Sequence, residues 1–281
     1  MIISKTINEI RSEITKVRPC KVAFVPTMGS LHQGHLELVK QAKKHADIVV
    51  VSIFVNKAQF NDPKDYNNYP RNIDKDAQLL KNVGATHLFT PFDEEMLPSD
   101  LSYKITSGDL VNCLCGSTRP GHFDGVSLIL TKFFNIINPD FLLMGKKDFQ
   151  QYLVVQKLVK DLNYKINVIG VDAVREESGL VMSSRNERLS EEQISLAKQI
   201  SICLEEIRES CLESPKEISK ILQRYKNKIT AMGFGKIDYL EVRREKDLAL
   251  INTLEEVSHP SRIFIAVYLD QIRLIDNVAI S

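Results

Sequence analysis

The sequence has almost no net charge. Its 281 residues include 37 Lys and Arg and 36 Asp and Glu, which leaves a formal net charge of +1 at pH 7. Proteins that bind nucleic acids or anionic membranes usually carry an excess of basic residues. The balance therefore argues against both kinds of partner and leaves open only a local basic patch.

Long apolar runs are also absent. A membrane-spanning helix needs about 20 predominantly apolar residues, and no stretch of that length occurs. Residues 1–13 contain several charged side chains and do not match the apolar core of a secretory signal. We therefore expect a cytoplasmic protein that does not associate with membranes.

Cysteine is sparse, and the cysteines are scattered. The chain has five, namely Cys20, Cys113, Cys115, Cys203 and Cys211. An odd, scattered set argues against a disulfide framework and fits reduced thiols inside a cell. Cys113 and Cys115, with His122 nearby, could in principle bind a metal, but their spacing matches none of the usual zinc patterns.

What the chain does contain is one stretch, residues 22–40, around which the rest is organised. The β-branched, apolar run Val22–Val25 predicts a buried strand. A turn is predicted at Pro26–Gly29, and the spacing of the apolar residues after it predicts an amphipathic helix. The stretch matches neither the GxGxxG fingerprint nor the GxxxxGK(S/T) phosphate loop.

Two histidines lie in the first turn of this predicted helix. Residues three apart share a helix face, so His32 and His35 should point the same way, and Gly34 lets a ligand approach the main chain. The unpaired N–H groups and the positive end of the helix dipole favour an anion such as phosphate. A single histidine here would most often be a surface residue, whereas two around a glycine favour the functional interpretation.

Up to residue 171, apolar and amphipathic segments alternate. Strands are predicted at 22–25, 47–55, 87–90, 140–144 and 165–171. Helices are predicted at 4–17, 72–83, 126–137 and 149–162. Such alternation predicts an α/β domain with a parallel sheet and helices on both faces, in which ligands bind at the carboxyl ends of the strands.

Beyond residue 188 the chain changes character. Two amphipathic helices are predicted first, at 190–212 and 214–231. Ser190 and Ser214 suit the N-cap positions, and Pro215 suits the first position of the second helix. Three strands are predicted to follow, at 236–243, 262–269 and 272–275.

These elements divide the chain into two predicted domains, and its length is sufficient for two cores. Residues 1–184 should form the α/β domain. Residues 185–281 should form a smaller α+β domain.

Polar residues gather where predicted strands end or where the two domains join, in four clusters that should converge. These are His32 with His35, Asn56 with Gln59, Lys147 and Asp148 with Gln150 and Gln151, and Ser183 and Ser184 with Arg185. Imidazole, ammonium, guanidinium and hydroxyl groups donate hydrogen bonds to phosphoryl oxygens, the cationic ones more strongly. Asp148 would suit a ribose hydroxyl, and Gln59 and Gln151 would suit a small polar substrate. No Ser–His–Asp arrangement or reactive cysteine is apparent, so a covalent protein nucleophile is not expected.

Each of these motifs also has a plain structural interpretation. Adjacent lysines such as Lys146 and Lys147 are usually a solvated pair. The segment Arg119–His122 could be only a turn. Met182–Arg185 is a weak signal by itself and is informative only together with the other motifs.

Taken together and in order, these motifs are specific. Five segments resemble, in the same order, the signature segments of the pantothenate synthetase (pantoate–β-alanine ligase) family, and they lie at 26–35, 54–60, 119–126, 145–151 and 182–186. This family belongs to the HIGH-motif nucleotidyltransferases, which include class I aminoacyl-tRNA synthetases. The segment 32–35 resembles the HIGH element, and 182–185 resembles its mobile KMSKS partner.

The resemblance implies an ATP-dependent ligase of pantothenate biosynthesis. It would condense (R)-pantoate with β-alanine through a pantoyl adenylate and release AMP and pyrophosphate, with Mg²⁺. It also implies a Rossmann-type N-terminal domain, a smaller C-terminal domain that acts as a lid, and a homodimer.

Site residues follow position by position from the resemblance and the predicted chemistry. The catalytic residues would be His35, as proton donor, with His32, Lys147 and Arg185. The implied ATP site consists of Met28, Gly29, Ser30, Leu31, His32, Gln33, Gly34, His35, Gly145, Lys146, Lys147, Asp148, Val174, Met182, Ser183, Ser184 and Arg185. The substrate contacts would be Gln59, Gln151, Asn56 and Arg119. Asp76 matches a carboxylate position that can hold the metal.

Two departures from the family pattern concern charge and a turn. The family usually has Glu where this chain has Lys146, which changes the charge near the site but keeps Lys147 and Asp148. It usually has Pro-Leu where this chain has Lys57 and Ala58, which should loosen the turn before Gln59.

Two other functions remain open on the residues alone. One is a nucleotidyltransferase that joins a nucleoside monophosphate to a phosphorylated acceptor and releases no AMP. The other is a non-catalytic RNA- or nucleotide-binding module, which should have a basic face and is disfavoured by the near-neutral charge.

Overall fold

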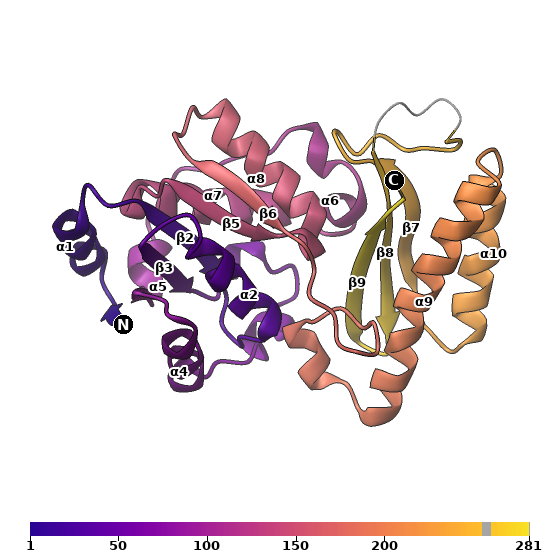
Figure 1. The fold of residues 1–281 in the computed structure, drawn as a ribbon, viewed down its shortest axis with the longest axis horizontal. Coiled ribbons are helices and arrows are strands. Elements are labelled where there is room, and N and C mark those ends of the chain that lie inside the picture. The colour runs from indigo at the N-terminus through magenta and orange to yellow at the C-terminus, as the bar shows by residue number, and fades with distance from the viewer. Residues whose placement is uncertain (255–259, 281) are drawn as a thin grey trace. The chain divides into compact units, whose positions relative to one another are not determined.

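The computed structural model describes residues 1–254 and 260–280, which form two compact units (Figure 1). The first unit comprises Met1–Asp109, Arg119–Lys146 and Val154–Asp172. The second comprises Leu110–Thr118, Lys147–Leu153 and the chain from Ala173 onward. The predicted domain boundary after residue 184 stays a prediction, and residues 255–259 and 281 of that second domain lie outside the described residues.

A six-stranded parallel sheet forms the centre of the first unit, in the order β1-β4-β3-β2-β5-β6. Its strands are β1 (Ile2–Ser4), β2 (Val22–Thr27), β3 (Ile48–Ile53), β4 (His87–Phe89), β5 (Phe141–Gly145) and β6 (Asn167–Val171). Its helices are α1 (Ile7–Val17), α2 (Gln33–Ala42), α3 (Pro63–Asn67), α4 (Ile73–Val83), α5 (Asp93–Met96) and α7 (His122–Ile137), while α8 (Phe149–Asp161) begins in the second unit and ends in the first. The predicted α/β parallel sheet is confirmed.

The central strands are covered on both faces. Ala23 of β2 shares a core with Val39 of α2 and Leu80 of α4. Phe24 points to the opposite face, where its ring centroid lies 5.3 Å from that of Phe133 in α7. Side chains alternate between faces along a strand, so a continuous apolar run requires a cover on each side.

The predicted helix at 4–17 is wrong at its start. Ile2–Ser4 form β1, which pairs with β4 at the edge of the sheet. The side chain of Thr6 accepts the N–H of Glu9, and the Glu9 carboxylate accepts the N–H of Thr6. This reciprocal capping box makes the helix begin at Ile7. The pairing of β1 is a tertiary contact, which a run of three residues does not reveal.

The strand order reverses between β2 and β5. Strands β3 and β4 are added on one side of β2, and β5 and β6 on the other. Because the strands are parallel, their carboxyl ends lie at one edge of the sheet, and ligands of open α/β sheets bind where the order reverses. The residues after β2, Met28–His35, and the last residue of β5, Gly145, lie at that edge.

The second unit is built on an antiparallel sheet of three strands, β7 (Ile237–Arg244), β8 (Ser261–Leu269) and β9 (Ile272–Ala279). One face packs against α9 (Glu191–Glu213) and α10 (Ile218–Ala231), with Leu240 and Ile265 in the shared core. The short helix α6 (Leu114–Thr118) also belongs to this unit. The smaller α+β part of the chain is as predicted. No helix in the described ranges is long and apolar enough to cross a membrane.

The N-cap prediction is confirmed for α9 and wrong for α10. Ser190 caps α9 through a capping box with Gln193. Ser214 instead ends α9, and α10 begins only at Ile218. The carbonyl of Pro215 accepts the N–H of Leu254. This contact with a distant residue holds the Pro215 carbonyl outside the helix.

His87 begins β4 in buried surroundings, with 3% of its surface exposed. Its Nδ1 lies 2.9 Å from the hydroxyl oxygen of Thr86, and its Nε2 has no hydrogen-bond partner among the described residues. Burial lowers the pKa of His87 below its ordinary value of 6.5, because a buried imidazolium loses its hydration.

We expect the chain to lose stability on acidification through His87. The unfolded chain takes up a proton near pH 6.5, whereas the folded chain resists until a lower pH, so the free energy of unfolding falls as the pH drops below 6.5. Urea unfolding at about pH 7.5 and about pH 5.5 should show a smaller loss for His87→Asn than for the unsubstituted chain. Equal losses would show that His87 does not contribute.

Candidate active site

The turn after β2 closes around a buried carboxylate. Asp76, in the first turn of α4, is 1% exposed, and its two oxygens accept the N–H groups of Ser30 and Leu31, each at 2.9 Å. Gly29 has a φ of +83°, and a Cβ there would lie 3.1 Å from Oδ2 of Asp76. A side chain at this position would be strained and would crowd the carboxylate. The contact therefore holds the main chain that leads into α2.

His32 and His35 cap the N-terminus of α2 with their rings. Nδ1 of His32 accepts the N–H of Gly34, and Nδ1 of His35 accepts the N–H of His32. An Nδ1 that accepts carries no proton, so each neutral ring has its proton on Nε2. The ring centroids lie 4.0 Å apart, so the two rings share one face as predicted.

The N-terminus of α2 adds a positive potential at the same place. The helix runs for 10 residues from Gln33, which is exposed, and its peptide dipoles favour an anion at this end. Together with two imidazole donors, the helix end suits phosphoryl oxygens. The prediction of a phosphate site thus has a local structural basis.

Gln59 follows β3, at the end of a 3-10 helix that Asn56 caps. Oδ1 of Asn56 accepts the N–H of Ala58 at 3.2 Å, while its Nδ2 donates to Oε1 of Gln59 at 2.9 Å and to the carbonyl of Gly125 at 3.0 Å. Nε2 of Gln59 donates to Sδ of Met28 at 3.0 Å. Asn56 is 1% exposed, so it lies behind Gln59 and orients its amide. These hydrogen bonds hold the turn before Gln59 in this chain, although Lys57 and Ala58 replace Pro-Leu.

The main chain of Gln59 is held as well as its side chain. Its carbonyl accepts from Nη2 of Arg119 at 3.1 Å and lies 2.8 Å from Nδ1 of His122. A carbonyl only accepts, so Nδ1 of His122 carries the proton, and its Nε2 accepts from Arg119 at 3.2 Å. The absence of a side chain at Gly125 lets the main chain of α7 lie close to that of Ala58, because a Cβ on Gly125 would lie 2.3 Å from the carbonyl oxygen of Ala58. The segment that starts at Arg119 is therefore more than a turn.

The two adjacent lysines have different surroundings. Lys146, which follows Gly145 at the end of β5, pairs with Asp172 at 2.8 Å, so Asp172 compensates part of the charge that replaces the family's Glu. Lys147 lies 3.6 Å from Asp148, and only 18% of its side chain is exposed. They do not form the solvated pair that adjacent lysines usually make.

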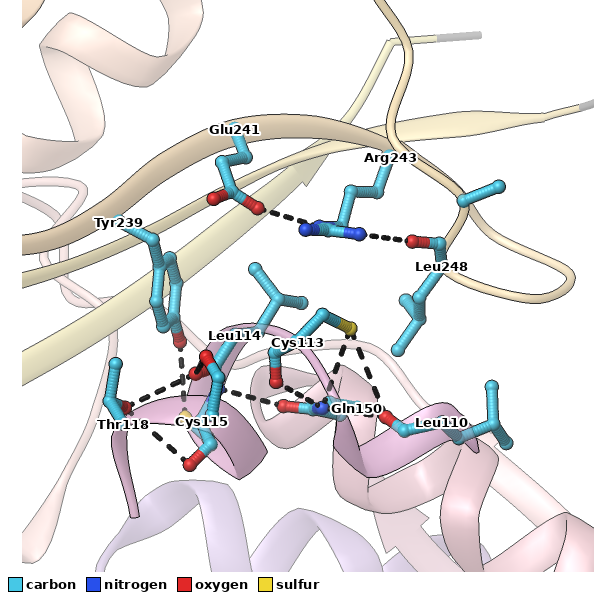
Figure 2. Close-up of polar contacts among 12 residues, drawn as sticks. Leu110, Cys113, Leu114, Cys115, Thr118, Gln150, Tyr239, Glu241, Arg243 and Leu248 are labelled. Carbon is cyan, nitrogen blue, oxygen red and sulfur yellow. Dashed lines mark hydrogen bonds and ion pairs between the residues drawn. The ribbon is translucent and has the colours of Figure 1, made fainter. Parts of the chain in front are cut away.

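Gln150 ties the start of α8 to the loop before α6 (Figure 2). Its Nε2 donates to the carbonyls of Leu110 at 2.8 Å and Cys113 at 2.9 Å, and its Oε1 accepts the N–H of Cys115 at 2.9 Å. Gln150 is 5% exposed, whereas Gln151 beside it is half-buried. The position of Gln151 thus depends on Gln150, whose role the residue pattern did not reveal.

Val174 and Met182 lie side by side at the open end of a short hairpin. The N–H of Met182 donates to the carbonyl of Val174 at 3.0 Å. Ser183 then caps a 3-10 helix that begins at Ser184, and its hydroxyl accepts the N–H of Arg185 at 3.3 Å. Within the second unit, these predicted ATP contacts form one continuous segment.

The described residues do not build a resident metal site. They contain no group of three or more His, Cys, Asp or Glu side chains that could hold an ion. Both oxygens of the buried Asp76 accept main-chain N–H groups. Magnesium usually keeps several waters and binds through one or two carboxylates and substrate phosphates. A role for Asp76 as a metal ligand stays a prediction.

The chain is similar to known proteins along its whole length. A model of the Pantoate-beta-alanine ligase family matches residues 2–279. The pantothenate synthetase of Pelotomaculum thermopropionicum is 42% identical over 279 residues, which cover 99% of this chain and 98% of the relative. That of Acinetobacter baylyi is 41% identical over 278 residues, which cover 98% and 97%.

Solved structures agree with this likeness. The pantothenate synthetase of Thermus thermophilus superposes with a TM-score of 0.91 at 35% identity and covers 100% of this chain and 99% of its own. The pantoate-beta-alanine ligase of Francisella tularensis, solved in complex with beta-gamma ATP and beta-alanine, superposes with a TM-score of 0.83 at 34% identity and covers 100% and 98%.

Asp76→Asn should destabilise the chain in the absence of any metal or nucleotide. An amide nitrogen cannot accept, so the N–H of Ser30 or Leu31 loses its partner and the free energy of unfolding falls by about 1–3 kcal/mol. Urea unfolding in the presence of a chelator measures the change, with Asp74→Asn, an exposed position in the same helical turn, as control. A loss that occurs only with magnesium present would instead identify Asp76 as a metal ligand.

Proposed function

Because the chain belongs to the pantoate–β-alanine ligase family, we propose that it condenses pantoate with β-alanine at the expense of ATP, with pantothenate, AMP and pyrophosphate as products. The family match over residues 2–279 carries this proposal. The local geometry supports it, because the His32–His35 pair, Gln59 and Lys147 are each held by specific contacts.

The first step joins two anions. The carboxylate of pantoate attacks the α-phosphorus of ATP, which forms pantoyl adenylate and expels pyrophosphate. Both reactants are negatively charged, so the protein must offset their repulsion and align the attacking oxygen with the bond that breaks. Charge develops on the phosphoryl oxygens, where fixed hydrogen-bond donors and cations are most effective.

The proposal assigns several donors to this charge. In the first unit, the Nε2–H groups of His32 and His35 would donate to phosphoryl oxygens at the N-terminus of α2. In the second unit, Lys147 and Arg185 would supply positive charge. The side chain of Lys147 is largely sheltered from water, which strengthens its attraction to phosphate.

The second step forms the amide. The amine of β-alanine attacks the carbonyl carbon of the adenylate, a C–N bond forms, the bond from carbon to the phosphate oxygen breaks, and AMP leaves as the nitrogen loses a proton. Gln59 and Gln151 would hold pantoate, and Gln59 would then hold β-alanine. We assign Asn56 and Arg119 to positioning Gln59, because both hydrogen-bond it in the structure.

The proposal includes features that follow from family membership. Magnesium would arrive with the phosphates of ATP and neutralise part of their charge, with Asp76 as the candidate protein ligand. Residues 185–281 would act as a lid that keeps water from the adenylate, together with Met182–Arg185. We also propose a cytoplasmic homodimer.

Pyrophosphate and AMP release test the proposal directly. With ATP, magnesium and pantoate alone, we expect a single burst of pyrophosphate, and addition of β-alanine should start steady release of AMP. Pyrophosphate that appears only with a phosphorylated acceptor, without AMP, would indicate a nucleotidyltransferase. Folded chain that is silent in both assays would contradict ligase activity and leave a binding module to be tested.

Lys147→Ala should slow the pyrophosphate burst by about 100-fold or more, because one cationic donor to the transferring phosphoryl group is lost. The thermal unfolding midpoint should stay close to that of the unsubstituted chain. Lys157→Ala, at an exposed position of α8, is the control and should keep the burst. A normal burst rate in Lys147→Ala would remove this residue from the mechanism.

A further inference from the structure

Two neighbouring residues of β9, Asp276 and Asn277, are polar and buried, with 4% and 7% of their surfaces exposed. Side chains alternate along a strand, so the two residues point to opposite faces of the small sheet. Asp276 shares its face with Leu274, which belongs to the core beneath α9 and α10. Asn277 lies on the other face, directly across from Phe264 of β8.

Asn277 holds the main chain of Lys147. Its Nδ2 donates to the carbonyl of Lys147 at 2.8 Å, and its Oδ1 accepts from Nη1 of Arg262 at 2.6 Å. The guanidinium of Arg262 also lies 4.3 Å from the ring centroid of Phe149, which in turn lies 5.9 Å from that of Phe264. Asn277 is thus itself held in place, and the segment 147–149 is bound through the main chain of Lys147 and the ring of Phe149.

Asp276 holds the hairpin that carries Val174 and Met182. Its two oxygens accept from Nη1 and Nη2 of Arg175 at 2.7 and 2.9 Å, a two-pronged ion pair. Nη1 of Arg175 also donates to the carbonyl of Gly179 at 3.0 Å, which braces the turn of the hairpin. One buried carboxylate therefore anchors the first arm of this hairpin to β9 and, through Arg175, also holds its turn.

We propose that Asp276 and Asn277 are positioning residues for nucleotide binding, which set the separation between Lys147 and the Val174–Met182 hairpin. The inference rests on the proposed function and on the ATP contacts that the family resemblance implies for Lys147, Val174 and Met182. The two anchors are adjacent on one strand, and Nη2 of Arg175 also donates to the carbonyl of Asn277 at 3.3 Å, so a shift of either segment would break hydrogen bonds to this strand. Asp276 and Asn277 would act through the segments that they hold and need not contact the nucleotide themselves.

The test is Asn277→Leu, which keeps the number of non-hydrogen side-chain atoms and the branch at Cγ, and removes the amide without adding a charge. We expect about a tenfold rise in the KM for ATP and a similar rise in the Kd of a non-hydrolysable ATP analogue, as expected for losing one positioning hydrogen bond. The KM for β-alanine should change by less than about twofold, because the amine does not depend on this anchor. Asp276→Asn, which weakens the ion pair, should produce the same split.

A matched control comes from the same sheet. Glu241 on β7 pairs with Arg243 at 2.6 Å, so Glu241→Gln weakens a partly buried ion pair that does not hold either segment (Figure 2). This variant should leave the KM for ATP unchanged. If it raises that KM as much as Asn277→Leu does, the effect is a general loosening of the sheet and the proposal is wrong.

A double substitution separates positioning from stability. In the Lys147→Ala background, Asn277→Leu should slow the pyrophosphate burst little further, because the residue that it positions is already gone. If the effects of Lys147→Ala and Asn277→Leu on the burst rate multiply, the assignment of Asn277 to positioning Lys147 is wrong. The proposal is also wrong if folded Asn277→Leu and folded Asp276→Asn both keep the KM and Kd for the nucleotide. The Kd does not require ligase activity, so an inactive chain that binds ATP would refute the proposed function while still testing this anchor.

Discussion

The two-sided burial of the parallel sheet is the constraint on which the rest of the first unit depends. With apolar side chains on both faces of β2, polar chemistry can be presented only where a strand ends. The strand order reverses between β2 and β5, so the turn after β2 lies at the preferred place for a ligand. That turn keeps its shape because the buried carboxylate of Asp76 satisfies two of its N–H groups.

A common device positions the candidate functional side chains. The protein holds them through their main chains and through buried neighbours: the carbonyl of Gln59 is bound by Arg119, and the carbonyl of Lys147 by Asn277. The ring nitrogens of His32 and His35 that face the main chain are used for capping. This arrangement orders the candidate side chains in advance, and in the proposed reaction it would reduce the entropy lost when substrates are aligned.

The charge of the whole chain says little about such a site. A net charge of +1 conceals local arrangements in which cations, imidazoles and a helix terminus are placed within single segments. The replacement of the family's Glu by Lys146 illustrates the point, since Asp172 offsets the added charge nearby. Electrostatic character is therefore set by neighbours that are remote in sequence.

The sequence by itself determined the α/β class, most element positions and the five segments that resemble the ligase family, because apolar periodicity and short motifs are local properties. It also placed His32 and His35 on one face, since helical spacing requires it. Only the tertiary structure decided that β1 joins the sheet, that Pro215 stays outside α10, and that Asn56 lies behind Gln59. Likewise, the anchoring of Lys147 by Asn277 joins residues far apart in the chain, and no local pattern records such a contact.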